Sequence, residues 1–135
     1  MAIGDIRSVI SAEAAYQSAN GNYYDTLECM GAPTGCIPNY TGPVFVDSTL
    51  SSGALKGGYK RTFHPGPAAP SSPDAGTRSP SSMTAFAYTA VPAEPNRTGI
   101  RGFCGDSSGR ICVTMDGTEP KVVNGECAPD CRMLN

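Results

Sequence analysis

The first twenty residues carry hydrophobic side chains at the 3.6-residue spacing of a helix. These side chains cover an arc of roughly 160° on a helical wheel. No proline interrupts residues 2–20, and Asn20-Gly21 suits the left-handed conformation that closes helices. The pattern therefore predicts a helix over residues 1–20 that packs its apolar stripe on the rest of the chain. The stripe consists of Ile3, Ile6, Val9, Ile10, Ala14 and Tyr16.

The opposite side of this helix carries small side chains where a surface helix usually carries lysine and glutamate. Within the helix only Asp5, Arg7 and Glu13 are charged. Small side chains let a second backbone approach closely, so this side is suited to docking another helix. The alternative is an ordinary amphipathic helix with an Ala/Ser-rich side in water. The small residues are Ser8, Ser11, Ala12, Ala15, Ser18 and Ala19.

Glu13 falls inside the apolar arc, near Ile6 and Val9. An unpaired buried carboxylate is strongly unfavourable. We therefore expect Glu13 to reach the rim of the helix contact or to pair with a base such as Arg101. The functional alternative is an ion pair between Glu13 and a neighbouring subunit.

Further along the chain, short alternating runs separated by turn residues predict an antiparallel sheet. In the clearest run, 83–91, Phe86, Tyr88 and Ala90 alternate with Ala87. Together with the helix, these strands predict an α+β fold in which the helix lies on a small sheet. The expected strands are 44–46, 58–63, 83–91, 99–104, 110–115 and 122–123.

Residues 64–82 interrupt this series with five prolines and five serines and almost no large apolar side chain. Such a composition cannot bury itself, so we expect an extended surface loop inserted between two strands. A solvated variable loop is the simpler interpretation, and a recognition surface is the functional one.

Six cysteines in a chain with 16 glycines and 12 prolines indicate an oxidising compartment, where disulfides supplement a small core. A hairpin centred near Ser108 would set Cys104 opposite Cys112. A metal cluster is the alternative, but no Cys-x-x-Cys occurs and His64 is the only histidine, so we expect no cofactor. Spacing favours the local pairs Cys29–Cys36, Cys104–Cys112 and Cys127–Cys131.

Length and charge restrict the function further. A chain of 135 residues, 39% of them hydrophobic, fits one domain (1–135) with a modest core. The net charge of -2 and the scattered basic residues favour neither nucleic acid nor an anionic membrane as a partner. No stretch approaches the ~20 apolar residues that span a bilayer, so we expect no membrane insertion by this chain.

Several motifs follow one another in a characteristic order. The helical run IRSVISAEAAYQS at 6–18 is followed by GNYY at 21–24, and strand-like segments then continue to about Met115. This series resembles the second half of the long helix and the strands of the globular head in bacterial type IV pilins and type II secretion pseudopilins. The insert at 64–82 and the tail at 116–135, with its extra cysteine pair, depart from the short versions of this head. The strand-like segments are GGYKRTF at 57–63, YTAVP at 88–92 and TGIRGFCGDSSGRI at 98–111.

The resemblance implies a pilin-like head and a structural, non-catalytic subunit of an extracellular or periplasmic pilus or pseudopilus. Its implied partners are other pilin subunits or a separate short hydrophobic pilin chain. A complete pilin begins with a prepilin-peptidase site and roughly 25 apolar residues, which this sequence lacks. We therefore expect a truncated pilin or the C-terminal chain of a split pilin. The expected helix interface consists of Ile3, Ile6, Ser8, Val9, Ile10, Ser11, Ala12, Glu13 and Ala15.

Two other classes of function remain as alternatives. A monomeric, secreted, disulfide-rich module could use its Pro/Ser loop and its tail to bind a ligand. An enzyme is suggested by Gly105-Asp106-Ser107-Ser108-Gly109, which matches Gly-x-Ser-x-Gly. A serine nucleophile needs a histidine base, for which His64 is the only candidate. A hairpin turn explains the motif more simply, so we expect no catalysis.

Minor motifs concern exposed loops. Asp116 and Glu119 flank a Gly-Thr pair and would suit a calcium ion, but the oxygen ligand set is incomplete and a solvated turn is favoured. Asn39-Tyr40-Thr41 and Asn96-Arg97-Thr98 match the N-glycosylation acceptor pattern, which is common by chance.

Overall fold

The computed structural model describes residues 2–47, 55–56, 58–71, 75–94, 96–97 and 99–134. The fold is α+β, with an N-terminal helix and an antiparallel sheet, as the sequence predicts. The helical elements are α1 (Ala2–Ala19), α2 (Leu27–Gly31) and the 3-10 turns η1 (Pro33–Gly35) and η2 (Ala75–Thr77). The strands are β1 (Leu55–Lys56), β2 (Tyr59–Pro65), β3 (Phe86–Pro92), β4 (Gly102–Asp106), β5 (Ile111–Thr114), β6 (Val122–Val123), β7 (Glu126–Cys127) and β8 (Arg132–Met133).

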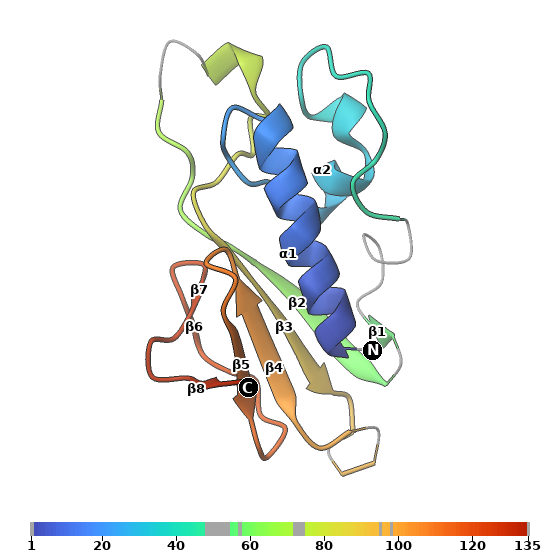
Figure 1. The fold of residues 1–135 in the computed structure, drawn as a ribbon, viewed down its shortest axis with the longest axis vertical. Helices are drawn as coiled ribbons and strands as arrows, with labels where there is room; N and C mark the ends of the chain where they lie inside the picture. Colours follow the sequence, from blue (N-terminus) through green and yellow to red (C-terminus); the bar gives the residue numbers. More distant parts are fainter. Residues whose placement is uncertain are drawn as a thin grey trace.

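The main sheet has the strand order β1-β2-β3-β4-β5-β8, and all neighbouring strands are antiparallel. The first five strands follow chain order as a meander, and β8 returns to the edge beside β5 (Figure 1). The β4–β5 hairpin turns at Gly109, whose φ of 85° is one that glycine adopts without strain. A separate ribbon of β6 and β7 lies in the C-terminal tail.

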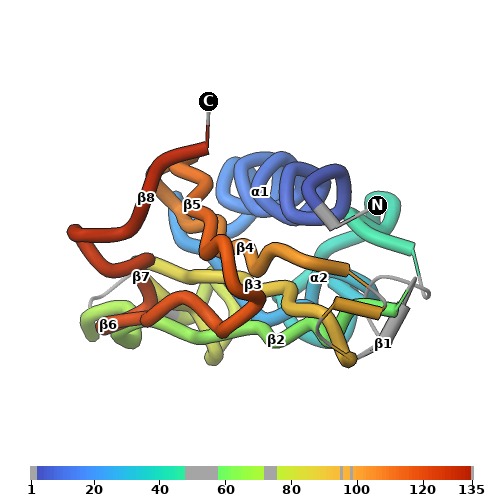
Figure 2. Tube along the Cα trace, turned by 90° about the horizontal axis from the view of Figure 1, so that it is seen from below, coloured from blue at the N-terminus to red at the C-terminus, as the bar shows by residue number. Residues whose placement is uncertain are grey.

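Helix α1 lies on one face of the sheet, over β3 and β4 (Figures 1 and 2). Its Ile6 and Val9 side chains are fully buried in the same core cluster as Phe86, Tyr88 and Ala90. The alternation predicted for this strand is confirmed from Phe86 onward, but the expected start at Met83 is three residues too early, because Met83 makes only isolated bridges with Tyr24 and Ala68. Burial of each large apolar side chain stabilises this contact by about 1.5–3 kcal/mol.

The C-terminal tail covers the opposite face of the sheet. Ala87 from β3 packs there with Cys104, Cys112 and Cys127 in a second buried cluster, and Val122 packs against it. Two disulfides, Cys104–Cys127 and Cys112–Cys131, join the tail to β4 and β5.

These bonds show that the Cys104–Cys112 and Cys127–Cys131 pairs expected from spacing are wrong. Cys104 does lie opposite Cys112 in the β4–β5 register. Both residues belong, however, to the sheet face that the tail crosses, so each bonds to a tail cysteine instead. The expected Cys29–Cys36 disulfide is confirmed, and it closes the segment that contains α2 and η1.

The expected strand at 44–46 is not formed. Phe45 and Val46 both donate their backbone N–H groups to the Met30 carbonyl, so this segment is tied to α2 rather than to the sheet. The Phe45 ring packs edge-on against Tyr16 of α1, with ring centroids 5.1 Å apart. This contact explains why an apolar run lies outside any strand.

The Pro/Ser-rich insert occupies 66–85, because β2 continues through Pro65 and β3 begins at Phe86. The expected start at His64 is therefore two residues too early. The expectation of a solvated loop holds only for part of the insert, since Arg78, Ser79 and Ser82 are buried. Among the described residues, no helix is long and apolar enough to cross a lipid bilayer.

Candidate functional site

The two sides of α1 have different roles in the fold. The buried side consists of Ile6, Val9, Ala12, Glu13 and Tyr16, and the expected stripe residues Ile3 and Ile10 are half-buried beside it. The prediction placed Ala14 in the apolar stripe and Ala12 on the small-residue side. In the structure Ala12 is buried and Ala14 is exposed. The physical reason is that Phe45, from the segment after α2, lies on the Ala12 flank of the helix and widens the buried arc.

The exposed side of α1 carries mainly small side chains. The Ser8 hydroxyl donates to the Gly4 carbonyl at 2.9 Å, one helical turn earlier. Because this hydroxyl already donates a hydrogen bond within its own helix, less hydrogen-bonding free energy is lost when another protein displaces the water around it. The exposed small residues are Gly4, Ser8, Ser11, Ala14, Ala15, Ser18 and Ala19.

A groove of about 350 Å³ runs along one flank of α1, between the helix and the end of the sheet. Ile10 forms one wall, and Ile111, Met133 and Leu134 form the other. Met133 is 47% exposed, so this wall offers apolar surface to a partner. No local pattern in the sequence marks these wall residues, because β5 and β8 reach α1 only through the tertiary fold.

A second groove, of about 480 Å³, follows the other flank of α1. Ser8, Ala12 and Ala15 line it from the helix, and Phe45 lines it from the segment after α2. Both grooves reach Arg7 and Ser11, so the exposed side of the helix forms a ridge between them.

Arg7 is the exposed charge on this ridge. No ion pair joins it to another residue within the ranges described above. Asp5, by contrast, pairs with the buried guanidinium of Arg61 on β2, which fastens the first turn of α1 to the sheet. A partner that covered Arg7 would therefore need to offer it a hydrogen-bond acceptor or a carboxylate.

Glu13 is fully buried, and the expectation that it reaches the rim or pairs with Arg101 is wrong. Its Oε1 atom accepts a hydrogen bond of 3.0 Å from the Asp25 backbone, whereas Arg101 lies over the Phe103 ring. Burial raises the pKa of the Glu13 carboxyl from 4.5 to about 8, and the neighbouring Asp25 charge also raises it. The Glu13 carboxyl is therefore mostly protonated and uncharged at neutral pH, so its burial needs no ion pair.

The Tyr16 hydroxyl extends this cluster by donating to Asp25 Oδ2 at 2.6 Å. Burial, and then the hydrogen bond to Asp25, raises the pKa of the Tyr16 phenol above its ordinary value. The link joins the middle of α1 to the segment that leads into α2.

The C-terminal end of α1 is held by Asn20. Its side chain accepts a hydrogen bond from the Ser79 backbone at 2.8 Å and donates to the Ser82 hydroxyl at 2.8 Å. The helix is closed by a hydrogen bond from the Asn22 N–H to the Gln17 carbonyl, with Gly21 and Asn22 at positive φ, as the Asn20-Gly21 pair predicts. The insert thus clamps the end of the helix.

The residues considered for catalysis have other partners. His64 Nε2 lies 2.9 Å from the Thr89 hydroxyl and 3.6 Å from Glu119. Ser107 lies in the β4–β5 turn and donates its backbone N–H to the Phe86 carbonyl. No hydrogen bond joins His64 to Ser107 within the described parts of the chain. The structure therefore does not bring the proposed nucleophile and base together.

The two carboxylates considered for calcium also diverge. Asp116 accepts hydrogen bonds from the Thr118 hydroxyl and backbone, which lower the pKa of its carboxyl. Glu119 accepts a hydrogen bond of 2.7 Å from the Thr89 hydroxyl on β3. Of the glycosylation motifs, Asn39 is exposed, while Thr98 of the second lies outside the described residues.

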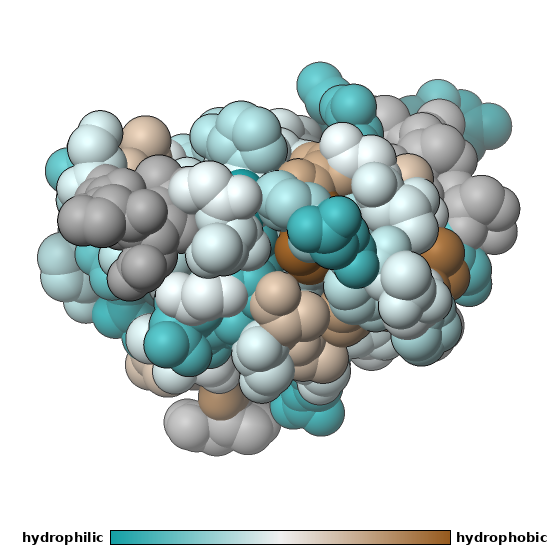
Figure 3. Space-filling view, turned by 90° about the horizontal axis from the view of Figure 1, so that it is seen from above, coloured by the Kyte–Doolittle hydropathy of each residue, from teal (hydrophilic) through white to brown (hydrophobic). Residues whose placement is uncertain are grey.

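The end of the molecule at which α1 finishes carries mostly residues of intermediate or hydrophilic character (Figure 3). Among the coloured atoms in Figure 3, teal and white predominate and brown atoms form small patches.

No protein-family model, no curated protein and no solved structure matches this chain. The features of this chain that bear on its function are the exposed ridge of α1 and the two grooves beside it.

Proposed function

We propose that this chain is a structural, non-catalytic subunit of a type IV pilus-like or pseudopilus-like filament and that it assembles through α1. The observation that carries the proposal is the position of α1, whose apolar side packs on the sheet while its small-residue side forms a ridge between two grooves. A helix seated beside this ridge can approach the α1 backbone closely at Ser11 and Ala15.

The anchoring of α1 supports this role. Asp5 ties its first turn to β2, Glu13 and Tyr16 tie its middle to Asp25, and Asn20 ties its end to the insert. Because both ends of the helix are fixed, its exposed side is presented without a further ordering cost on assembly.

The partners that fit are other subunits of the filament or a separate short hydrophobic helix. An apolar helix in one groove would cover Ile10 and Met133, and one in the other groove would cover Phe45. Either helix would need one acceptor group for Arg7. The three disulfides are compatible with an extracellular or periplasmic location.

Site-specific photo-crosslinking in the native host tests the proposal. A photoreactive side chain at Ser11 or Ala15 is expected to give a ladder of subunit adducts, or one adduct with a short hydrophobic peptide. The same side chain at Thr34 or Ser71, which are exposed on other parts of the molecule, serves as the matched control.

Adducts that are equally strong at the α1 and control positions would contradict assembly through α1. Monomeric protein with adducts confined to Ser71 would favour the alternative of a free, disulfide-rich binding module. Mass spectrometry of each adduct distinguishes self-association from capture of a separate chain.

A further inference from the structure

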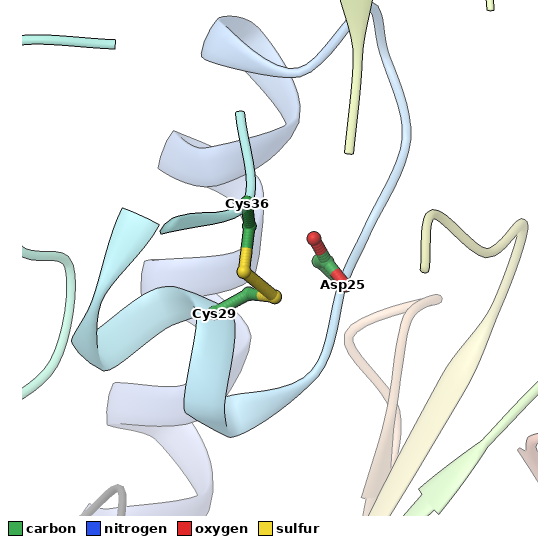
Figure 4. Close-up of side chains that lie close together, drawn as sticks. All are labelled: Asp25, Cys29 and Cys36. Atoms are coloured by element: carbon green, nitrogen blue, oxygen red, sulfur yellow. A yellow bond between two sulfur atoms is a disulfide. The ribbon is translucent and has the colours of Figure 1, made fainter. Parts of the chain in front are cut away.

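A cluster of potential metal ligands lies beside α2, away from the exposed ridge of α1. A carboxylate oxygen of Asp25 and the sulfur atoms of Cys29 and Cys36 all lie within 4.8 Å of one another. Figure 4 shows the Asp25 carboxylate next to the disulfide that joins the two cysteines. Among the described residues, this is the one place where three such groups come so close.

We propose that reduction of the Cys29–Cys36 disulfide converts this cluster into a zinc site held by two thiolates and the Asp25 carboxylate. Zinc binds cysteine sulfur at about 2.3 Å and carboxylate oxygen at about 2.0–2.2 Å. Ligand atoms around a tetrahedral zinc ion therefore lie roughly 3.4–3.8 Å apart. The two sulfur atoms, which are bonded to each other in the disulfide, must move apart to reach this spacing, while the Asp25 oxygen already lies within 4.8 Å of both. The Cα atoms of the two cysteines are 5.7 Å apart, so side-chain rotation separates the sulfur atoms without moving the backbone.

The surroundings of Asp25 are those of an oriented ligand. Tyr16 donates to its Oδ2 atom, while the Thr26 backbone at 2.8 Å and the Ser81 hydroxyl at 2.5 Å donate to Oδ1. Such second partners fix the direction of a metal-binding carboxylate. Cys36 is half-buried, so a water molecule beside it can complete the coordination.

An independent observation also favours a cation here. The Oε2 atom of Glu13 is buried without a hydrogen-bond partner, and the other oxygen of Glu13 is bonded to the Asp25 backbone. The Asp25 carboxylate adjoins the disulfide, and among the described residues no basic side chain is hydrogen-bonded to it. A divalent cation would compensate the charge of this buried carboxylate.

The reaction balances as an exchange between a disulfide and a metal. A dithiol reductant supplies two electrons and two protons, becomes a disulfide itself and leaves Cys29 and Cys36 as thiols. Zinc binding then releases those two protons. Oxidation by an external disulfide reverses the sequence, re-forms the Cys29–Cys36 bond and expels the ion.

Cobalt and zinc titrations of the full chain test the site under anaerobic, reducing conditions. We expect a thiolate-to-cobalt charge-transfer band with the visible bands of tetrahedral Co²⁺. Asp25→Asn should lower the affinity at least about tenfold. Removing both cysteines (Cys29→Ser with Cys36→Ser) should lower the zinc content by one ion per chain. Any zinc that this variant still binds measures binding by the other four thiols. Glu28→Gln, an exposed acid in α2, is the matched control and should bind like the wild type.

Addition of a disulfide oxidant should release the ion, which a chromogenic chelator detects. Circular dichroism of each reduced protein shows whether the fold is retained. Equal cobalt spectra and equal affinities for the wild type, Asp25→Asn and the double cysteine variant would overturn the proposal. A reduced chain that unfolds and does not refold with zinc would overturn it as well.

Discussion

Gly105 on β4 lies directly beneath Ile6 on α1, so a Cβ atom at position 105 would collide with the Cγ2 atom of Ile6. The helix approaches the sheet so closely at this point that only glycine fits. The position of α1, and of the ridge it exposes, depends on this contact.

Gly105→Ala should therefore destabilise the chain by lifting α1 from the sheet. We expect a loss of about 1–3 kcal/mol in the free energy of unfolding, measured by urea denaturation. Gly35→Ala is the control, because a Cβ there meets no atom within 4 Å and its change should stay within about 0.5 kcal/mol. Equal stability of the two variants would show that α1 does not sit as described.

Glu13 predicts a dependence of stability on pH in the disulfide-bonded chain. The pKa of its carboxyl is about 8 in the folded chain and 4.5 ordinarily. Between these values the unfolded state binds fewer protons than the folded state, so stability falls as pH rises from 4.5 to 8 and then levels off.

The variant Glu13→Gln removes this titration. We expect its free energy of unfolding to exceed that of the wild type by about 3 kcal/mol at pH 7, with a difference that shrinks toward pH 4.5. Urea denaturation across this pH range measures both curves. Parallel curves for the two proteins would mean that Glu13 titrates normally and is not buried.

Three neighbouring alanines on α1 distinguish folding from assembly. Ala12→Lys should destabilise the chain by about 1–3 kcal/mol or more, because the longer side chain has no room in the buried side of the helix. Ala14→Lys and Ala15→Lys lie on exposed positions and should change stability by less than about 0.5 kcal/mol. Thermal unfolding measures these effects.

The same exposed lysines should abolish filament incorporation while leaving the fold intact. Wild-type yields of filament with Ala14→Lys and Ala15→Lys would contradict the proposed role of the ridge. Thr34→Lys is a suitable control for the added charge, since Thr34 is exposed on another part of the surface.

Peptide mapping without reduction tests the disulfide pairing. Trypsin cuts after Arg101, Arg110, Lys121 and Arg132, and the bonds described above then join three peptides in one species. The local pairing expected from spacing would give a two-peptide species and a separate peptide with an internal bond. A second digestion before Asp130 separates Cys127 from Cys131 and identifies the partner of each.

Features that depend on local periodicity were predictable from the sequence. The alternation of Phe86, Tyr88 and Ala90 against Ala87 assigned the two faces of β3 correctly, because side-chain direction in a strand follows from position alone. The start of the strand was predicted three residues too early. The start and end of α1 also followed from the hydrophobic spacing and from Asn20-Gly21.

Features that depend on chain reversal were not predictable. Glu13 meets Asp25 because residues 20–26 fold back on the helix, and no local pattern encodes that return. The disulfides were assigned incorrectly for the same reason, since spacing detects sequence neighbours and Cys127 lies 23 residues from Cys104. The grooves combine α1 with Phe45, Ile111 and Leu134, which come together only in three dimensions.

The arrangement of the disulfides has a mechanical consequence. The bonds Cys104–Cys127 and Cys112–Cys131 overlap along the sequence, so the stretch from 104 to 131 forms a covalently closed unit. Force applied between the two ends of the chain would separate α1 and the strands that precede β4 from the rest of the fold. It would barely extend the 104–131 unit, because the two disulfides limit the length of that stretch. A subunit under tension would therefore keep residues 104–131 covalently cross-linked after the earlier strands have separated.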